Sequence, residues 1–538
     1  MNSLLGYIKK RKDITIIFLI IAVSTAYLSS KLSIYLGNFF DLAGGSISIG
    51  IDELFRFTLM SLFGYVVLNL VLDVVKGKFI NIISIFLKEN FIERLFKKSI
   101  VEFNKKDKIE YKSLIISDIN QIIDLFITYR FEIINNMAKI IVSIIVLLRI
   151  NVLGTLLVLM LSTFPIIVSI LLSSKIGVYV QKFIGGKQEF IKRNSELLTG
   201  FDTFTIYGSK TNAINEFEKT NRKEAEIKRK SFIFIEGLSG IIGITSISIT
   251  ILTMIVGMFL ALKGWITIGQ VFTLSFISNG VSTPLMDLSS IIPEYLGGKK
   301  IVDKYEGLLE INEIKREKPI NFEKGISSKD LGLSRDKKIL ENINIELEKD
   351  NKYLFVGGSG SGKSTLVKLL IGQLDDYEGD IYWNNINLDE ISEESIYENV
   401  TYLPQEAFLL NDTIRNNLTL FNSDISDEKI YEALEFVNLK EMFKGSTEGL
   451  DYVINEEKSN LSGGEKQRLA LARGLLYLNK VLIMDEATSA LDNENFRDIE
   501  NKIANIGNLT VINVCHRINE EFKSKYSKVI NFEKGKIV

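Results

Sequence analysis

The stretch that best indicates the fold of the second half of the chain is Val-Gly-Gly-Ser-Gly-Ser-Gly-Lys-Ser-Thr at residues 356–365. It follows an apolar run at residues 353–356 and precedes a helical run at residues 366–370, which is the strand–loop–helix setting of a phosphate-binding loop. Glycines let successive backbone N–H groups converge on a phosphate, and the start of a helix adds favourable partial charge. We expect Lys363 to reach the β- and γ-phosphates of a nucleotide and Ser364 to ligate Mg²⁺. The residues expected to hold the phosphates are Gly358, Ser359, Gly360, Ser361, Gly362, Lys363, Ser364 and Thr365.

A second apolar run, Val-Leu-Ile-Met at residues 481–484, ends in two carboxylates. This pattern indicates a buried strand, and Asp485 at its end suits the coordination shell of Mg²⁺. Glu486, one residue further on, can polarise an attacking water as general base. Two adjacent acids can also be solvated residues that merely end a strand. The wholly apolar strand, in a chain with a phosphate loop, favours the catalytic interpretation.

A second glycine-containing loop, Leu-Ser-Gly-Gly-Glu-Lys-Gln-Arg at residues 461–468, precedes another run with helical spacing. Taken alone, Ser-Gly-Gly is a common turn, but at the start of a helix it can form a second anion site. One chain therefore carries two phosphate-facing elements. The residues expected at this second element are Ser462, Gly463, Gly464 and Glu465.

Composition limits the other possibilities. The chain has 538 residues, a formal net charge of −2, one cysteine and one histidine. An intramolecular disulfide, a Cys-x-x-Cys site and a multi-histidine metal site are therefore excluded, and the charge gives no sign of nucleic-acid binding. The single histidine, His516, follows the apolar run at residues 510–515. Any histidine chemistry in this protein must take place there.

The apolar residues gather before residue 300, where several runs reach the ~20 residues needed to cross ~30 Å of hydrocarbon. The first run follows the basic residues 9–12, which places the N-terminus and the C-terminal soluble domain on the cytoplasmic side. Its length, and the absence of a small-residue cleavage site, argue against a cleavable signal peptide. We expect six spans, at residues 14–36, 55–77, 131–150, 152–175, 232–262 and 266–290.

Two long, highly charged segments separate the second span from the third and the fourth from the fifth. They can be independent cytoplasmic loops, or the span helices can continue as rigid levers with elbows near residues 107–114 and 207–213. Only levers give a mechanical link to the soluble domain. Ionisable residues are scarce inside the spans, with Glu236 and Asp73 as exceptions. Glu236 is a candidate substrate contact, although both residues lie near the expected cytoplasmic ends of their helices.

With these motifs in place, the whole chain resembles a half-unit of an ABC transporter of the exporter-type architecture. Residues 357–365 resemble its Walker A motif, residues 481–486 its Walker B motif and residues 461–465 its signature loop. The resemblance implies a multidomain fold. An all-α six-helix transmembrane domain with two long cytoplasmic helical extensions is expected at residues 1–310, and an α/β P-loop ABC ATPase domain at residues 311–538.

The resemblance also implies roles for residues outside these motifs. Gln405, in Tyr-Leu-Pro-Gln, matches the Q-loop glutamine, which senses Mg²⁺ and water and faces the membrane domain. Asp492, in Ser-Ala-Leu-Asp, matches the D-loop, and residues 408–418 also look like family sequence. His516 matches the switch histidine, which contacts the γ-phosphate. The implied ligands are ATP and Mg²⁺, the metal being held by Ser364, Gln405 and Asp485.

Three positions depart from the family pattern. The family usually stacks an aromatic residue on adenine at a position that falls near Leu333, and residues 329–339 contain no aromatic residue. Stacking on a base contributes about 1–3 kcal/mol, so this departure puts nucleotide affinity and base selectivity in doubt. Glu465 replaces the commoner glutamine of the signature loop, with a minor expected effect. Residues 454–458, Ile-Asn-Glu-Glu-Lys, only loosely follow the family's Gly-Glu-Arg-Gly segment, in which Glu456 is the expected equivalent of the coupling glutamate.

In the family, each of two ATP molecules lies between Walker A of one nucleotide domain and the signature loop of the other. The resemblance therefore implies a dimer with a second half-transporter, and intact Glu486, His516 and signature loop favour a homodimer over a heterodimer. The implied function is ATP-driven export of a peptide-like or amphipathic molecule across a bacterial-type cell membrane by alternating access. Import of a metal chelate and an ATP-gated channel or sensor are alternatives. Six spans exclude a soluble ABC ATPase of repair or translation.

Overall fold

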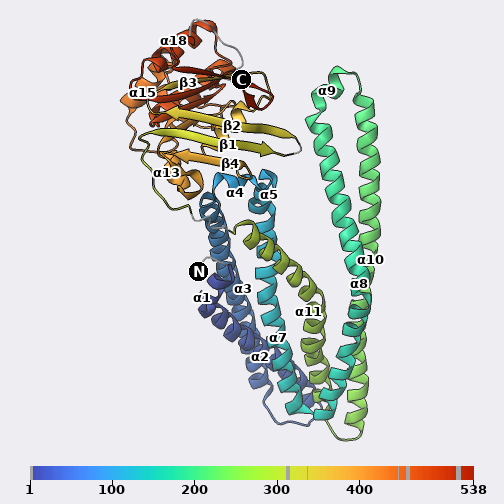
Figure 1. Ribbon diagram of the computed structural model, residues 1–538. Helices are drawn as coiled ribbons and strands as arrows, with labels where there is room; N and C mark the ends of the chain where they lie inside the picture. Colours follow the sequence, from blue (N-terminus) through green and yellow to red (C-terminus); the bar gives the residue numbers. More distant parts are fainter. Residues whose placement is uncertain (1–3, 311–315, 336, 446, 456–460, 516–522) are drawn as a thin grey trace. The chain divides into compact units, whose positions relative to one another are not determined.

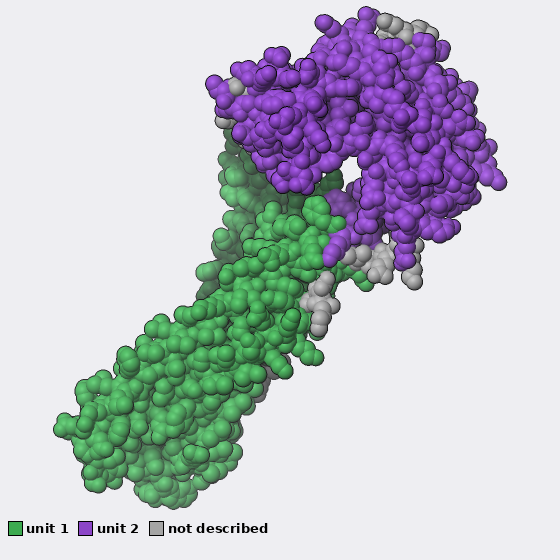
Figure 2. Space-filling view, turned by 90° about the vertical axis from the view of Figure 1, so that its left-hand side faces the viewer, with its two compact units in different colours: residues 1–96, 107–310 green, residues 97–106, 311–538 purple. Residues whose placement is uncertain are grey.

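The computed structural model (Figure 1) describes residues 4–310, 316–335, 337–445, 447–455, 461–515 and 523–538. They divide into two compact units, which Figure 2 shows in separate colours. The first unit contains Met1–Phe96 and Asp107–Glu310, and the second contains Lys97–Lys106 and Ile311–Val538. The second unit thus includes a short piece of the segment that connects two membrane helices.

The first unit is helical; five of the six expected spans fall within a long helix of their own, and the sixth, 266–290, begins two residues before its helix. The long helices are α2 (Lys12–Ala43), α3 (Ile51–Phe96), α7 (Tyr129–Ile150), α8 (Val152–Thr199), α10 (Lys210–Leu262) and α11 (Ile268–Leu308). The shorter elements are α1 (Leu4–Lys10), α5 (Lys108–Ser113), the π-helical turn η1 (Leu114–Asp118), α6 (Ile119–Gln121), the π-helical turn η2 (Ile122–Thr128) and α9 (Phe201–Ile206).

The helices differ in whether their length and hydropathy are sufficient for them to cross a membrane. Within the described residues, three stretches are long and apolar enough to cross a membrane: Lys12–Ala43, Ile51–Phe96 and Lys108–Ile150. Val152–Thr163 and Ile247–Leu262 are shorter apolar helices. Helix α11 is not among them, since polar residues line its buried face.

Helix α11 packs against α2, α7, α8 and α10. Three of its buried residues are serines, and the hydroxyl group of each donates a hydrogen bond to a backbone carbonyl of the same helix. Ser275 donates to Val271 O at 3.0 Å, Ser278 to Ser275 O at 2.7 Å and Ser282 to Ser278 O at 3.0 Å. These bonds satisfy the hydroxyl groups locally, so the small side chains allow close helix packing without an unpaired polar atom.

The start of α11 is fixed to α2 by a buried carboxylate. Asp41 accepts hydrogen bonds from the Thr267 hydroxyl and from the Gly269 backbone N–H, both at 2.7 Å. The helices touch backbone to backbone there, because a Cβ atom at Gly37 would lie 2.5 Å from Gly269 O. Thr267 and Gln270 complete a capping box at the same helix start.

The two cytoplasmic connections match the expected elbows to different degrees. Around α9 the chain breaks at Gly200 and again at residues 207–209, within the range expected for the second elbow. The first connection breaks on both sides of α4 (Ile100–Asn104), at residues 97–99 and 105–107, so only Asp107 falls within the range expected for the first elbow, and α5 and η1 occupy the rest. Asp107 suggested a turn, but it is the N-cap of α5, where its Oδ1 accepts the Ile109 N–H at 2.9 Å.

The second unit combines two β-sheets with helices. Its strands are β1 (Gly325–Ser334), β2 (Lys338–Glu348), β3 (Lys352–Gly357), β4 (Glu378–Trp383), β5 (Ile386–Asn387), β6 (Val400–Leu403), β7 (Val481–Asp485), β8 (Thr510–Cys515), β9 (Lys528–Glu533) and β10 (Lys536–Ile537). Besides α4, its helices are α12 (Lys363–Leu370), η3 (Leu388–Glu390), α13 (Glu393–Tyr397), α14 (Ile414–Thr419), α15 (Asp427–Phe436), α16 (Lys440–Lys444), η4 (Gly449–Asp451), α17 (Gly463–Leu476) and α18 (Asn493–Ala504).

The larger sheet has the order β10-β9-β3-β8-β7-β6, and its strands from β9 to β6 are parallel. The antiparallel sheet has the order β2-β1-β4-β5. One apolar core joins this sheet, α12 and one face of the parallel strands, whereas a second core joins the other face to α14, α15, α17 and α18. Because parallel strands end at the same edge, the segments after β3, β6 and β7 come together there, beside the end of β8.

Candidate functional site

The phosphate-binding loop lies between β3 and α12 at this edge. Two of its glycines have left-handed backbone angles, with φ of 76° at Gly360 and 98° at Gly362. A Cβ atom at Gly362 would also lie 2.6 Å from Leu340 Cδ2. The glycines that identified the motif are therefore required by the turn itself.

Lys363, the first residue of α12, folds back into this loop. Its Nζ donates to Gly357 O at 2.7 Å and to Gly358 O at 2.9 Å, and lies 3.4 Å from Ser361 Oγ. Burial lowers the pKa of the Lys363 ammonium, and the carboxylate of Glu486 opposes that shift. With only 4% of the residue exposed, the loop holds a cation inside it, which suits the binding of phosphate charge.

The end of β7 brings Asp485 next to the loop. Asp485 Oδ1 accepts a hydrogen bond from Ser364 Oγ at 2.7 Å, and Oδ2 accepts one from the Tyr402 hydroxyl at 3.2 Å. Two of the expected Mg²⁺ ligands, Ser364 and Asp485, are thus in direct contact, and oxygen ligands of this kind fit Mg²⁺. Tyr402, on β6, orients the carboxylate, and the sequence motifs gave no sign of it.

Glu486 leaves the strand in a left-handed conformation, with φ of 54°, which is uncommon for a glutamate. Its backbone N–H donates to Val514 O at 3.1 Å, so β8 helps to hold this turn. Glu486 Oε2 accepts a hydrogen bond from Gln405 Nε2 at 2.9 Å. The structure therefore brings together the predicted general base and the predicted Q-loop glutamine.

The second glycine loop caps helix α17. Glu465 N–H donates to Ser462 Oγ at 3.3 Å, and Ser462 N–H donates to Glu465 Oε2 at 2.7 Å. This backbone N–H lowers the pKa of the Glu465 carboxyl. The helix start also contacts the loop after β7, because Gln467 Oε1 accepts the Ala490 N–H at 2.9 Å. Among the described residues, no hydrogen bond joins this loop to the phosphate-binding loop.

Four other predicted positions have different outcomes. Asp492 is the N-cap of α18 and accepts the backbone N–H groups of Glu494 at 3.1 Å and Asn495 at 2.9 Å. His516 and Glu456 lie outside the described residues. The position expected to stack on adenine, Leu333, is 2% exposed and belongs to the core beside β1, so it offers no face to a base.

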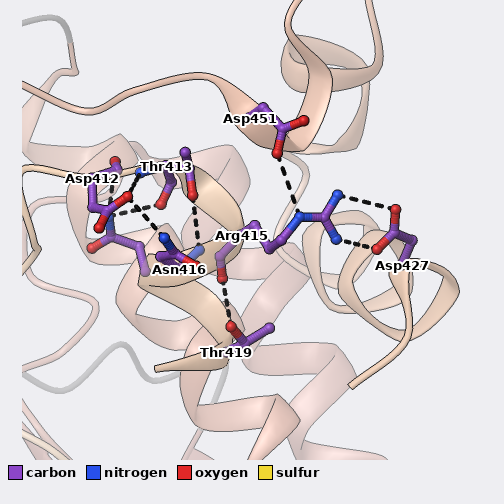
Figure 3. Close-up of polar contacts among 8 residues, drawn as sticks. Asp412, Thr413, Arg415, Asn416, Thr419, Asp427 and Asp451 are labelled. Atoms are coloured by element: carbon purple, nitrogen blue, oxygen red, sulfur yellow. Dashed lines mark hydrogen bonds and ion pairs between the residues drawn. The ribbon is translucent and has the colours of Figure 1, made fainter. Parts of the chain in front are cut away.

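The segment after Gln405 is held by the polar cluster in Figure 3. Arg415, on α14, donates through Nη2 to Asp427 Oδ2 at 3.1 Å and through Nε to Asp451 Oδ1 at 3.4 Å. At the start of the same helix, Asp412 Oδ1 accepts the Asn416 amide at 2.9 Å. The cluster joins α14 to the start of α15 and to η4, although such exposed ion pairs each add little stability.

The piece of connecting segment in the second unit has polar anchors of its own. The Ile100 backbone N–H, at the start of α4, donates to Glu393 Oε1 at 2.9 Å. Lys105 Nζ, just after α4, lies 2.6 Å from Asp375 Oδ2. Burial raises the pKa of Glu393, while the Ile100 N–H opposes that shift. Helix α4 is therefore fastened at both ends.

Two family models match the chain. The model described as ABC transporter transmembrane region matches residues 14–285, and the model described as ABC transporter matches residues 340–489. The chain belongs to the ABC transporter family. The family and the fold class predicted from the sequence are thereby confirmed: a multi-pass membrane protein with an ATP-binding domain.

Relatives of this ABC transporter chain have export or transport in their names. It is 35% identical over 268 residues to the microcin-J25 export ATP-binding/permease protein of Escherichia coli, covering 48% of this chain and 46% of the relative. It is 26% identical over 545 residues to the lactococcin-A transport/processing ATP-binding protein of Lactococcus lactis subsp. lactis, covering 97% and 72%. A solved bacterial Atm1-family ABC exporter with ATP bound has a TM-score of 0.83 over 99% of this chain and 95% of that one, at 20% identity, which shows the fold alone.

Several polar residues inside the expected spans of the ABC transporter chain were missed by the sequence analysis. Lys76 and Glu132 form an ion pair between α3 and α7, and Lys31 on α2 lies over the rings of Tyr27 and Tyr35 at 5.7 and 5.9 Å. A count of charges within the span boundaries would have found all three. Glu236, the candidate substrate contact, is exposed on α10.

Proposed function

We propose that two copies of this chain form an ATP-driven exporter of a peptide-like or amphipathic molecule. One observation carries the proposal: a single chain has one complete phosphate-binding edge and one separate signature loop. The Lys363 loop, the Ser364–Asp485 contact and the Gln405–Glu486 contact lie at the first. Since the second loop makes no hydrogen bond to the phosphate-binding loop within the described chain, a second copy is the natural source of the missing half of each site.

The residues at this edge of the sheet have separate roles in ATP binding and hydrolysis. Lys363 neutralises phosphate charge, and Ser364, Asp485 and Gln405 would hold Mg²⁺. When bound, Mg²⁺ supplies charge neutralisation at the phosphate oxygens. Glu486 accepts the proton of the attacking water, and Gln405 keeps its carboxylate oriented. His516 is assigned to the γ-phosphate on the resemblance described above.

Export is favoured over the alternatives by the names of the relatives. The microcin and lactococcin proteins are named for the export or transport of their cargo, which supports a peptide-like substrate here. Helices α8 and α10 have 48 and 53 residues, or about 70–80 Å at ~1.5 Å per residue. That length exceeds the ~30 Å of hydrocarbon, so each helix extends beyond the bilayer as a lever. With the N-terminus and the nucleotide domain in the cytoplasm, closure of two nucleotide domains on ATP would move these levers.

The substitution Glu486→Gln tests the nucleotide site. The amide keeps the size of the side chain and a contact with Gln405 but cannot take a proton. We expect ATP to bind unchanged while turnover falls by about 10²- to 10⁴-fold, the usual contribution of a general base. Radiolabelled ATP binding and phosphate release on the full chain in vesicles measure the two steps. Wild-type turnover in this variant would remove Glu486 as the base.

The transport step needs its own measurement. In inverted membrane vesicles, an exporter accumulates substrate against its gradient only with ATP. Ion currents without uphill movement would favour a channel, and loss of substrate from the vesicles would favour import. Co-purification of two differently tagged copies tests the homodimer, and recovery of one tag alone would favour a heterodimer.

A further inference from the structure

A basic cavity lies where α1 meets α2. It has a volume of about 300 Å³ and is lined by Tyr7, Lys10, Arg11, Lys12 and Asp13, which we call the basic junction. Three cationic side chains thus share the cavity with one carboxylate. Within the described part of the chain, none of the three cationic side chains makes a hydrogen bond or ion pair. The basic junction therefore carries uncompensated positive charge.

The surface beside the basic junction is apolar. The hydrophobic run of α2 begins at Ile14, and Ile16, Ile17 and Ile20 are 52%, 50% and 60% exposed. At ~1.5 Å per residue, Ile16 is only about 6 Å along the axis from Lys12. A ligand with a negative head and apolar chains can satisfy both surfaces at once, whereas a soluble anion satisfies only the first. This favours a lipid.

Helix α1 is tied to the long helices by its first residue, Leu4, and by Tyr7. The Leu4 backbone N–H donates to Glu306 Oε1 at 2.9 Å, and Glu306 Oε2 accepts a hydrogen bond from Arg94 Nη1 at 2.6 Å. Tyr7, which lines the cavity, also stacks on Phe86 with ring centroids 3.8 Å apart and an interplanar angle of 9°. Helix α1 thus connects the basic junction to α3 and α11. A ligand held there would restrict the movement of these two helices relative to α1.

We propose that the basic junction binds the phosphate headgroup of an anionic phospholipid, in the leaflet on the side of the N-terminus. The bound headgroup stabilises the contacts of α1 with α3 and α11. Basic residues at a membrane surface attract anionic lipid in any case, at about fivefold in affinity for each charge, the equivalent of about 1 kcal/mol. A built site differs from that general attraction because it depends on which cations line the cavity.

The neighbouring residues offer a matched comparison. Arg11→Gln and Lys9→Gln each remove one positive charge two positions apart, but only Arg11 lines the cavity. The full chain is purified in neutral detergent and titrated with dioleoyl phosphatidylglycerol, and the rise in unfolding temperature gives an apparent dissociation constant. Unfolding temperatures without lipid show whether each variant folds. The titration uses neither ATP nor transport, so failure of the proposed export function would leave this test intact.

We expect phosphatidylglycerol to stabilise the wild-type chain more than phosphatidylcholine does. Arg11→Gln should weaken the effect about fivefold, and Lys9→Gln less than about twofold, because a charge outside the cavity acts only through the general field. Equal weakening by the two variants would overturn the proposal, since it indicates diffuse attraction. So would a shift of the same size with glycerol 3-phosphate, which would assign the cavity to soluble phosphates, or no response to phosphatidylglycerol.

Discussion

Helix α4 offers a direct test of how the nucleotide domain senses the membrane helices. It lies in the connection between α3 and α5, yet it belongs to the second unit. Its first backbone N–H is held by Glu393, 2.9 Å away. We expect Glu393→Ala to uncouple ATP hydrolysis from transport, because the variant removes this acceptor and leaves the nucleotide-binding edge untouched.

The size of the effect follows from the contact. A hydrogen bond to a charged group contributes about 1.5–3 kcal/mol when buried. Because Glu393 is partly exposed, we expect its bond to the Ile100 N–H to contribute about 1–2 kcal/mol to the docking of α4. That weakens the docking of α4 by roughly 5- to 30-fold. The ion pair of Lys105 with Asp375 joins more exposed side chains and contributes less than about 1 kcal/mol. Glu393 is therefore the stronger of the two anchors.

Proteoliposomes allow ATP turnover and substrate movement to be measured in one preparation. The quantity of interest is the amount transported per ATP hydrolysed, which should fall severalfold in Glu393→Ala while ATP turnover stays within about twofold. Glu394→Ala is the matched control: the neighbouring glutamate of the same helix is exposed and should leave the ratio unchanged. Glu393→Gln keeps an acceptor oxygen and should fall in between. If Glu393→Ala folds normally and transports as much per ATP as the wild type, the anchor has no part in coupling.

Three further outcomes follow from individual residues. With Leu333 in place of an aromatic residue, ATP and GTP should have KM values within about threefold in ATPase assays, because base stacking cannot separate them. Glu465→Gln should keep the capping box, since an amide oxygen can accept the same Ser462 N–H, and should change ATP turnover by less than about twofold. Burial raises the pKa of Glu500, so its stabilising effect is full below the unfolded pKa and lost as pH rises through the folded one. Thermal unfolding of Glu500→Gln should therefore vary less with pH in that window than that of the wild type.

The sequence predicted the parts of the site that depend on short-range geometry. The phosphate loop, the acids after β7 and the cap at Ser462 are each set by a few consecutive residues, so a motif describes them fully. The contact of Gln405 with Glu486 joins residues far apart in the chain, and only the resemblance suggested it. Tyr402 had no sequence signal, because no motif in β6 indicates which of its side chains reaches Asp485.

The membrane half was predicted from hydropathy, which gives the helices and not their packing. The spans follow from apolar length, whereas α11 is buried by its neighbours although serines line its contact face. The range expected for the first elbow extended too far beyond Asp107, because aspartate is favoured both in turns and at helix starts. A second helix start lies earlier in the same connection: Ser99 caps α4 by accepting the Glu102 N–H at 3.1 Å. The connection therefore already breaks before Asp107.

The link between α17 and the loop after β7 has a consequence for a dimer. Gln467 accepts the Ala490 N–H at 2.9 Å and donates to Ser489 Oγ at 3.3 Å. Ser489 N–H in turn bonds to Glu486 O at 3.1 Å. In one chain, therefore, a short series of hydrogen bonds runs from the general base of its own ATP to the start of its signature helix. If two copies combine as proposed, that helix faces the partner's ATP, so a change at Glu486 in one site reaches the other site through residues of a single chain. Gln467→Ala would remove the connection without touching either nucleotide, and it should lower the cooperativity of hydrolysis between the two sites more than the rate at either one.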